Sequence, residues 1–282
     1  MYKDESPVTA LGISGPLAIG LAALSLMPGN PMAARAVRWT ERIRSFAGAR
    51  FSAEGYLGLH LTIGALLLIV AAWIFGAIAE DVATSDRITV LDVQLANWLH
   101  SHATPWLTHV MLTISTLHGV LSIIVLSAVL AAFFAWRRQW HWLLALILAV
   151  PGGMLLNTLL KLVFERARPH FADPIVLLDT YSFPSGHVAG STLFYGILAA
   201  FLIARSQSGV RKIAITLLAL LLVSLVAASR LYLGAHYFSD VVGGFLESVA
   251  WLALCVTGVG VFRRRRSLRF GAVGKNVAAD RR

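Results

Sequence analysis

Three short polar clusters in an otherwise apolar stretch contain the residue types that phosphate chemistry requires. In chain order they are Lys161-x6-Arg168-Pro169, Pro184-Ser185-Gly186-His187, and Ser229-Arg230-x5-His236-x3-Asp240. Together they supply three cations, two histidines and one carboxylate. Three cations beside two histidines, with only one carboxylate to balance them, predict a binding site for an anion. Phosphate is the anion that suits this set.

The clusters are separated by apolar segments long enough to cross a bilayer, so their charges are expected at or near membrane depth. A charge at the centre of a membrane helix costs about 2.5–3.5 kcal/mol on insertion scales. Ionisable residues at such positions therefore predict a functional site rather than a structural one.

The cations and the backbone are expected to bind the phosphate. A phosphoryl group in transfer spreads negative charge over three oxygens, so catalysis depends on positioning and electrostatic stabilisation. Arg168 and Arg230 can each hold two oxygens in a fork, and Lys161 adds a point charge. Ser185 and Gly186 lie where a helix is predicted to begin, and their free backbone N–H groups are expected to cradle the anion.

The histidines are the candidates for the chemical step, because no thiol and no metal-ligand cluster accompanies the three motifs. His236 and Asp240 are four residues apart, so one helical turn places them on the same face. Asp240 is then able to accept a hydrogen bond from one ring nitrogen and leave the other free to attack phosphorus. His187 has no such partner in the sequence and suits proton donation to the leaving oxygen.

This three-part pattern resembles the signature of the type 2 phosphatidic acid phosphatase family, which includes membrane lipid phosphatases and soluble acid phosphatases. The resemblance covers roughly Arg50 to Arg265 and includes every signature position. It implies that His236 forms a phosphohistidine, that Asp240 supports it and that His187 is the general acid. It also implies that neither a metal nor another cofactor takes part.

The function expected from these residues is hydrolysis of a phosphomonoester or pyrophosphate of a membrane lipid at the outer face of the membrane. Phosphatidic acid, phosphatidylglycerophosphate and undecaprenyl diphosphate are the candidate substrates that the resemblance implies. Two alternatives stay open. One is a lipid phosphotransferase with the same site, and the other is a transporter or binding protein that holds a phosphate lipid without chemistry.

The composition indicates a membrane protein. Hydrophobic residues make up 57% of the 282 residues, charged residues 13%, and the mean hydropathy is +0.73. The net charge of +10 does not predict a nucleic-acid partner, because most Lys and Arg residues lie beside apolar spans. No protein partner is implied. The single cysteine, Cys255, excludes an intrachain disulfide and a cysteine-based metal site.

The apolar pattern predicts an all-α polytopic membrane protein built as a six-helix bundle, with interfacial helices over about 93–113 between the first two spans. The six spans are expected at about 56–78, 119–136, 142–164, 187–204, 213–228 and 241–262. Within the third span, Pro151-Gly152-Gly153 is expected to serve close helix packing.

Three regions follow from this pattern. Residues 1–50 are an N-terminal extension, interfacial or poorly ordered, with a basic juxtamembrane part. Residues 51–265 form the membrane phosphatase domain, and residues 266–282 are a basic cytoplasmic tail. Basic segments at 35–50, 137–138, 205–212 and 263–266 predict that both terminal regions are cytoplasmic and that all three clusters lie outside. Usage rich in Ala, Leu and Arg without long extramembrane loops indicates a bacterial plasma membrane.

Several other polar residues near the clusters are expected to have structural roles. Arg166 is predicted to be solvated. Asn157 is predicted to pack in the core, and the alternative is that it reaches the site one helical turn before Lys161. A metal site formed by His100, His102 and His109 is the weaker alternative to an interfacial loop, because no carboxylate or cysteine joins them at ligand spacing.

Overall fold

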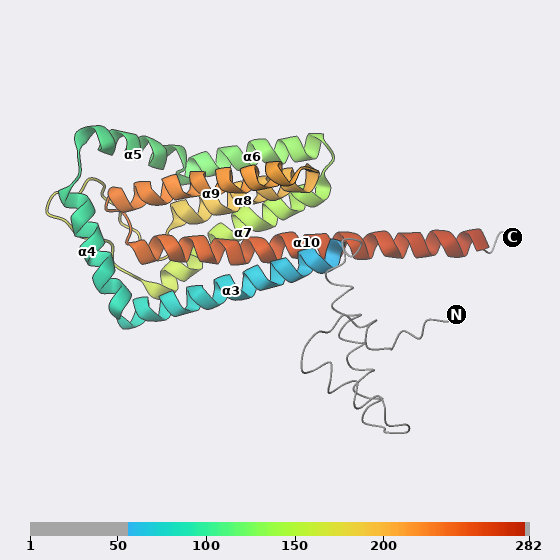
Figure 1. The fold of residues 1–282 in the computed structure, drawn as a ribbon, viewed down its shortest axis with the longest axis horizontal. Helices are drawn as coiled ribbons and strands as arrows, with labels where there is room; N and C mark the ends of the chain where they lie inside the picture. Colours follow the sequence, from blue (N-terminus) through green and yellow to red (C-terminus); the bar gives the residue numbers. More distant parts are fainter. Residues whose placement is uncertain (1–55, 280–282) are drawn as a thin grey trace, which may run out of the picture. The chain divides into compact units, whose positions relative to one another are not determined.

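The computed structural model describes the backbone of residues 56–279 and the side chains of residues 61–264. The predicted extension at residues 1–50 lies outside the described residues. Within the described part the regular secondary structure is entirely helical, as predicted (Figure 1). The helices are α3 (Tyr56–Thr84), α4 (Arg87–Ser101), α5 (Pro105–Leu117), α6 (Val120–Trp136), α7 (Trp140–Phe164), α8 (Gly186–Arg205), α9 (Gly209–Tyr232) and α10 (Phe238–Ala279).

Five of the described helices are long and apolar enough to cross a membrane, namely α3, α7, α8, α9 and α10. The remaining predicted span, the second one at about 119–136, is formed in another way. Helix α6 has only 17 residues, but it passes the same test together with α5, from which it is bent by 46°. Six spans are therefore present when the bent pair is taken as one. The protein is a multi-pass membrane protein.

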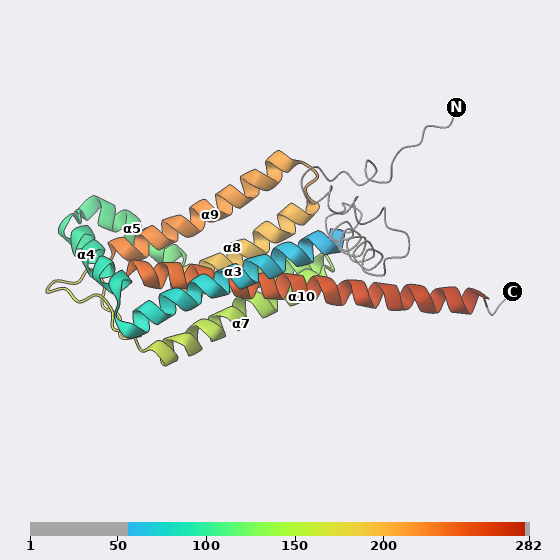
Figure 2. The same ribbon diagram turned by 60° about the horizontal axis from the view of Figure 1, so that its bottom comes forward.

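Helix α8 lies at the centre of the bundle and packs against α7, α9 and α10 (Figure 2). Its side chains Leu193, Ile197 and Phe201 belong to a core that α6, α7 and α10 complete. A methyl group at Gly153 would lie 2.5 Å from Leu193 Cδ1. The helix α7 thus needs glycine there to approach α8, and the Pro-Gly-Gly sequence serves packing, as predicted.

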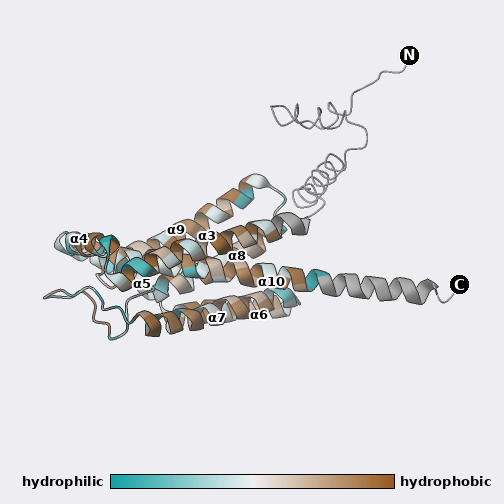
Figure 3. Ribbon diagram, turned by 90° about the horizontal axis from the view of Figure 1, so that it is seen from below, coloured by the Kyte–Doolittle hydropathy of each residue, from teal (hydrophilic) through white to brown (hydrophobic). Residues whose placement is uncertain are grey.

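The outward faces of the spans carry large apolar side chains that the bundle does not cover. Trp73 is 75% exposed, Leu121 74% and Val163 73%. Figure 3 shows hydrophobic residues along the spans and hydrophilic ones gathered around α4 and near the helix ends. Apolar side chains exposed in this way suit contact with lipid. The helices themselves can cross a bilayer because their backbone polar groups are hydrogen-bonded within each helix.

Helix α4 crosses one end of the bundle and is amphipathic (Figure 1). Its buried residues are Asp92 and Ala96, whereas Leu91 and Trp98 are 64% and 57% exposed. An exposed tryptophan beside apolar residues is typical of a helix that lies in the membrane interface. This agrees with the first part of the interfacial stretch predicted at about 93–113, whereas α5, which was also predicted to be interfacial, forms a bent span together with α6.

The four helices that carry the predicted clusters meet at the α4 end of the bundle. Helices α7 and α9 finish there, and α8 and α10 begin there (Figure 1). At the other end, α10 does not stop with the predicted sixth span but continues as a helix to Ala279.

Candidate active site

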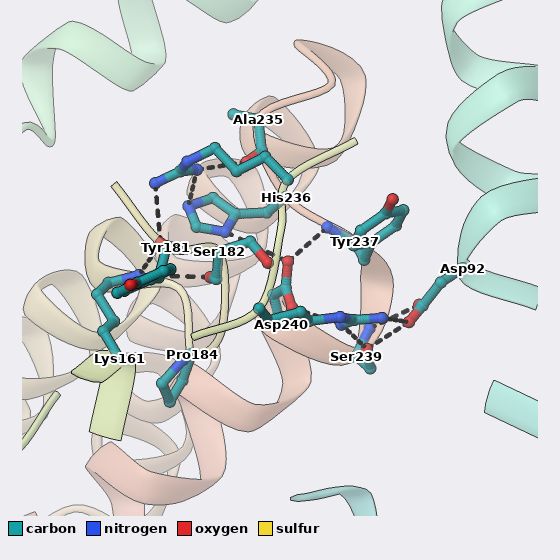
Figure 4. Close-up of polar contacts among 12 residues, drawn as sticks. Asp92, Lys161, Tyr181, Ser182, Pro184, Ala235, His236, Tyr237, Ser239 and Asp240 are labelled. Atoms are coloured by element: carbon teal, nitrogen blue, oxygen red, sulfur yellow. Dashed lines mark hydrogen bonds and ion pairs between the residues drawn. The ribbon is translucent and has the colours of Figure 1, made fainter. Parts of the chain in front are cut away.

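The three sequence clusters converge into one polar site although they are far apart along the chain. Lys161 lies in the last turn of α7, His187 in the first turn of α8, Arg230 in the last turn of α9 and Asp240 in the first turn of α10. His236 lies in the short connection between α9 and α10. Figure 4 shows His236, Asp240 and Lys161 in this site.

His236 is buried, with 3% of its surface exposed, and is held between a carboxylate and a guanidinium. Its Nδ1 lies 3.5 Å from Asp240 Oδ2, and its Nε2 lies 3.2 Å from Arg168 Nη1. A guanidinium only donates hydrogen bonds, so Nε2 presents its lone pair to Arg168 and Nδ1 carries the proton toward Asp240. The ring therefore has the tautomer that leaves Nε2 available as a nucleophile.

Burial also keeps the His236 ring neutral. Desolvation lowers the pKa of His236 to about 3, with Asp240 opposing that shift and the charges of Arg168 and Arg230 adding to it. A neutral imidazole is the form that has a free lone pair. Burial at this site therefore favours the neutral form of the His236 ring.

The cations Lys161, Arg168 and Arg230 are bound by neutral oxygen atoms. Lys161 Nζ donates to the Tyr181 carbonyl at 2.8 Å, and Arg230 Nη1 donates to Ser115 Oγ at 2.5 Å. Arg168 donates from Nε to the Thr180 carbonyl at 2.6 Å and from Nη1 to that of Ala235 at 2.5 Å.

Within the described part of the chain, none of these three cations forms an ion pair with a carboxylate. Burial lowers the pKa of Arg168, and the charge of Asp240 offsets this only in part. Arg230 Nε is buried and makes no hydrogen bond with a described residue. Positive charges that are buried or half-buried without a carboxylate partner are chemically suited to bind an anion.

The Pro184-Ser185-Gly186-His187 motif forms the entry to α8. The Ser185 amide donates to the Asp240 carbonyl at 2.9 Å, so it is not free for an anion, and that part of the prediction is wrong. The close approach explains Gly244 on α10, where a methyl group would lie 2.6 Å from the Ser185 carbonyl oxygen. Ser185 Oγ, in contrast, is buried and has no described partner.

The amides of Gly186 and His187 begin α8, and neither has a hydrogen-bond acceptor among the described residues. Free N–H groups at a helix start, together with the Ser185 hydroxyl, suit a phosphate oxygen. Anion binding by Gly186 stays a prediction, and the group of Ser185 that is free to bind an anion is its hydroxyl.

His187 is half-buried and forms no hydrogen bond with a described side chain or backbone group. Arg230 and His236 are close enough to act on its charge. A methyl group at Gly119, in the break between α5 and α6, would lie 3.9 Å from His187 Nε2. The bend of that span thus brings its backbone beside the histidine that the sequence predicts to be a proton donor.

Arg166 corrects a prediction, because its side chain is only 12% exposed and is not solvated. It donates to Asp240 Oδ1 at 2.6 Å and to Asp92 Oδ2 at 2.8 Å. Burial alone would lower the pKa of Arg166, but the charge of Asp240 and hydrogen bonds to both carboxylates raise it. Arg166 and Arg168 are two residues apart in a stretch without helix. In an extended chain, side chains two residues apart point to the same side, so this spacing could have indicated that both face the site.

A second buried polar pair, Asn157 and Glu247, lies next to the Pro184-Ser185-Gly186-His187 motif. Asn157 Nδ2 donates to Glu247 Oε2 at 3.2 Å and lies 3.5 Å from the Pro184 carbonyl oxygen. Asn157 is buried, as expected for a core residue, but it also contacts the loop that carries Ser185. Glu247 is seven residues after Asp240 on the same face of α10, a spacing that could have indicated it.

The histidines of the α4–α5 region do not gather into one site. His100 Nε2 lies 3.1 Å from Asp173 Oδ1, and the His100 ring stacks on Phe171. His102 Nδ1 lies 2.8 Å from the Trp98 carbonyl oxygen. Across the described residues, no three His, Cys, Asp or Glu side chains are grouped so that they could hold a metal ion.

Fold and site together define a helical membrane protein with a cationic, histidine-containing anion site at one end of its bundle. Residues 140–264 match the model of the PAP2 superfamily. Phosphatidylglycerophosphatase B of Bacillus subtilis (strain 168) is 37% identical over 143 residues, which cover 50% of this chain and 70% of that protein. The chain therefore belongs to the PAP2 superfamily.

A solved structure agrees with this assignment. The crystal structure of a transmembrane PAP2 type phosphatidylglycerolphosphate phosphatase from Bacillus subtilis has a TM-score of 0.61 and 30% identity, and the match covers 70% of this chain and 96% of that one. LpxE of Aquifex aeolicus has a TM-score of 0.48 and 22% identity, over 59% of this chain and 94% of that one.

Proposed function

We propose that this protein is a membrane lipid phosphatase that hydrolyses a lipid phosphomonoester through a phosphohistidine on His236. The observation that carries the proposal is the set of three cations, Lys161, Arg168 and Arg230, which lie beside two histidines and form no ion pair with a carboxylate among the described residues. Membership of the PAP2 superfamily and the similarity to a phosphatidylglycerophosphatase support a lipid phosphate as the anion.

In the first half of the reaction, Nε2 of His236 attacks phosphorus while the bond from phosphorus to the lipid oxygen breaks. His187 donates a proton to that oxygen, and the dephosphorylated lipid leaves. A phosphate dianion beside His187 favours the protonated form that this step needs. Asp240, next to Nδ1, stabilises the positive charge that develops on the His236 ring.

In the second half, His187 takes a proton from water while the water oxygen attacks phosphorus and the nitrogen–phosphorus bond breaks. Inorganic phosphate leaves, His236 is neutral again, and His187 again carries its proton. Arg168, Arg230 and Lys161 hold the phosphoryl oxygens in both halves, where charge develops in the transition state. No step requires a metal.

The proposed position of the site is the outer face of a bacterial plasma membrane. Arg137 and Arg138 join α6 to α7, Arg211 and Lys212 begin α9, and Arg263 lies in α10 past the predicted sixth span. All of these basic residues lie toward the bundle end opposite the site, and such residues favour the cytoplasm. Both terminal regions would then be cytoplasmic.

The test is phosphate release by purified protein in detergent with EDTA present. The substrates are phosphatidylglycerophosphate, phosphatidic acid and undecaprenyl diphosphate. Wild type is expected to turn over at least one of them without loss to EDTA. His236→Ala and His187→Ala are expected to lose about a thousandfold or more in kcat. His109→Ala, which changes an exposed histidine on α5, is the matched control and should keep wild-type activity.

Rapid quenching at alkaline pH, where phosphohistidine persists, should trap phosphate on wild type and not on His236→Ala. Binding of these lipids without turnover by wild type would contradict the proposal and favour a transporter or binding protein. Transfer of the phosphoryl group to an added alcohol, with no release to water, would favour a phosphotransferase.

A further inference from the structure

Arg166 forms a bridge between two buried carboxylates at the back of the candidate site. Its Nη1 donates to Asp240 Oδ1 at 2.6 Å, and its Nη2 donates to Asp92 Oδ2 at 2.8 Å. The side chains of Asp92 and Asp240 are both 0% exposed. Two carboxylates so deeply buried are stable as anions only when charge and hydrogen bonds compensate them, and Arg166 supplies both.

Asp92 also holds the backbone beside Asp240. The Ser239 amide donates to Asp92 Oδ1 at 2.9 Å, and Ser239 Oγ donates to Asp92 Oδ2. Arg166 Nη1 additionally donates to Ser239 Oγ at 2.7 Å. Figure 4 shows Asp92 and Ser239 beyond Asp240, on the side away from His236. A residue on the interfacial helix α4 thus fixes the first turn of α10, which carries Asp240.

Arg166 contacts only one carboxylate oxygen of Asp240, and the other oxygen faces His236. Oδ1 is occupied by Arg166, whereas Oδ2 accepts the Tyr237 amide at 2.8 Å and lies 3.5 Å from His236 Nδ1. With Oδ1 held, the carboxylate plane cannot turn, so Oδ2 stays directed at the imidazole. Arg166 on Oδ1 and the Tyr237 amide on Oδ2 together set the direction in which the Asp240 carboxylate faces His236.

Arg166 is distinct from the phosphate-binding arginines in every contact. Both of its terminal nitrogens are used by carboxylates and Ser239, and its guanidinium lies 4.5 Å from the centroid of the Tyr237 ring. Arg168, two residues later, instead contacts Nε2 of His236, the nitrogen that would face phosphorus. The two arginines thus hold opposite sides of the same histidine–aspartate pair.

We infer that Arg166 and Asp92 are positioning residues, which hold Asp240 and thereby keep His236 Nε2 aligned for attack on phosphorus. The inference rests on the phosphohistidine mechanism proposed above. It assigns the pair to the chemical step and not to phosphate binding, because neither residue contacts a group that would hold the phosphate.

The decisive comparison is Arg166→Lys against Arg168→Lys, with phosphate release, inhibition by inorganic phosphate and phosphoenzyme formation measured for each. A lysine has one nitrogen and cannot reach two carboxylates in the geometry of the guanidinium fork. Arg166→Lys is expected to lower kcat about 10–100-fold with KM and phosphate inhibition changed by less than about threefold. Arg168→Lys is expected to weaken phosphate inhibition and raise KM.

Asp92→Asn and Ser239→Ala test the same bridge with smaller changes and serve if Arg166→Lys does not fold. Both should lower kcat and the rate of phosphoenzyme formation at unchanged KM. Asp173→Asn, which changes a carboxylate that is 92% exposed, is the matched control and should behave as wild type. In the double variant Asp92→Asn, Arg166→Lys, the loss should be smaller than the product of the single losses, because the residues act as one unit.

Folding of each variant is checked by gel filtration and thermal unfolding in detergent. Folded Arg166→Lys or Asp92→Asn with wild-type kcat would overturn the inference, and so would a fall in kcat matched by an equal rise in KM. Absence of phosphate release by wild type would instead overturn the proposed function. The two failures are therefore distinguishable in one assay.

Discussion

At the scale of single residues, the site depends on a histidine whose charge is suppressed by burial. His236 is 3% exposed and lies beside the guanidinium of Arg168, and both conditions disfavour a second ring proton. Asp240 opposes them but does not overcome desolvation, which lowers the pKa of His236 to about 3. The same burial that keeps the His236 ring neutral is therefore expected to make the folded protein sensitive to acid.

The stability of the fold should fall below neutral pH because of this residue. In the unfolded chain the His236 pKa is the ordinary 6.5, and in the folded chain it is about 3. Between these pH values the unfolded chain binds a proton at His236 that the folded chain does not bind. The contribution of His236 to the free energy of unfolding is therefore close to zero above pH 6.5 and becomes destabilising as the pH falls below it. At about pH 4.5 the loss amounts to about 3 kcal/mol.

Thermal unfolding in detergent, followed by tryptophan fluorescence between about pH 7.5 and 4.5, measures this effect. The midpoint temperature of wild type should fall with pH, and that of His236→Asn should fall several degrees less. His109→Asn, which removes an exposed histidine, should follow wild type. Equal pH dependence in wild type and His236→Asn would show that the His236 ring is not held neutral.

At the scale of elements, the site exists because helix ends come together more closely than ordinary side chains permit. Helix α10 passes so near the Ser185 loop that a methyl group on Gly244 would lie 2.6 Å from a backbone oxygen. Backbone atoms cannot turn aside as a flexible side chain can. The contact also places the Asp240 carbonyl where it accepts the Ser185 amide, so α10 sets the position of the α8 start.

Replacement of Gly244 by alanine is therefore expected to displace the start of α8 and reduce activity. Gly244→Ala should lower kcat/KM about tenfold or more, because a misplacement of about 1 Å can cost a hundredfold. Gly258→Ala is the control on the same helix, since a methyl group there meets no atom within 4 Å. It should keep full activity and raise the unfolding temperature slightly, through helix propensity. Equal phosphate release by both variants would refute the packing argument.

The sequence predicted the elements better than the contacts between them. Lys161, His187, Arg230 and Asp240 could be placed because each lies where an apolar span begins or ends, and span ends are visible in one-dimensional hydropathy. The 46° bend between α5 and α6 could not be placed, because nothing local to residues 117–120 distinguishes a bent span from an interfacial helix followed by a short one.

Polar pairs between residues far apart in the sequence could not be predicted for a related reason. The Arg166–Asp92 pair spans 74 residues, and in the sequence each partner has an ordinary alternative, solvation for the arginine and an acidic loop for the aspartate. Only the fold shows that α4 crosses the end of the bundle where both are buried. Local spacing thus indicates the residues of the three clusters, but not the buried Arg166–Asp92 pair packed behind them.

At the scale of the whole molecule, the opposite ends of the spans differ in charge and in role. The polar site lies at the end that α4 crosses, and the connections 137–139 and 206–208 lie at the other. The distribution of basic residues favours an outward-facing site. A lipid phosphate in the outer leaflet would then reach the cations without crossing the bilayer, and the released phosphate would leave outside.

Sidedness can be measured by cysteine labelling, because Cys255 is the only cysteine in the chain. With Cys255→Ala as background, Asp179→Cys marks the connection between α7 and α8, and Gln207→Cys marks the one between α8 and α9. Both positions are exposed in the structure. A membrane-impermeant maleimide should label Asp179→Cys in intact spheroplasts and Gln207→Cys only after lysis. The reverse pattern would place the site in the cytoplasm, and phosphate lipids of the inner leaflet would then be its substrates.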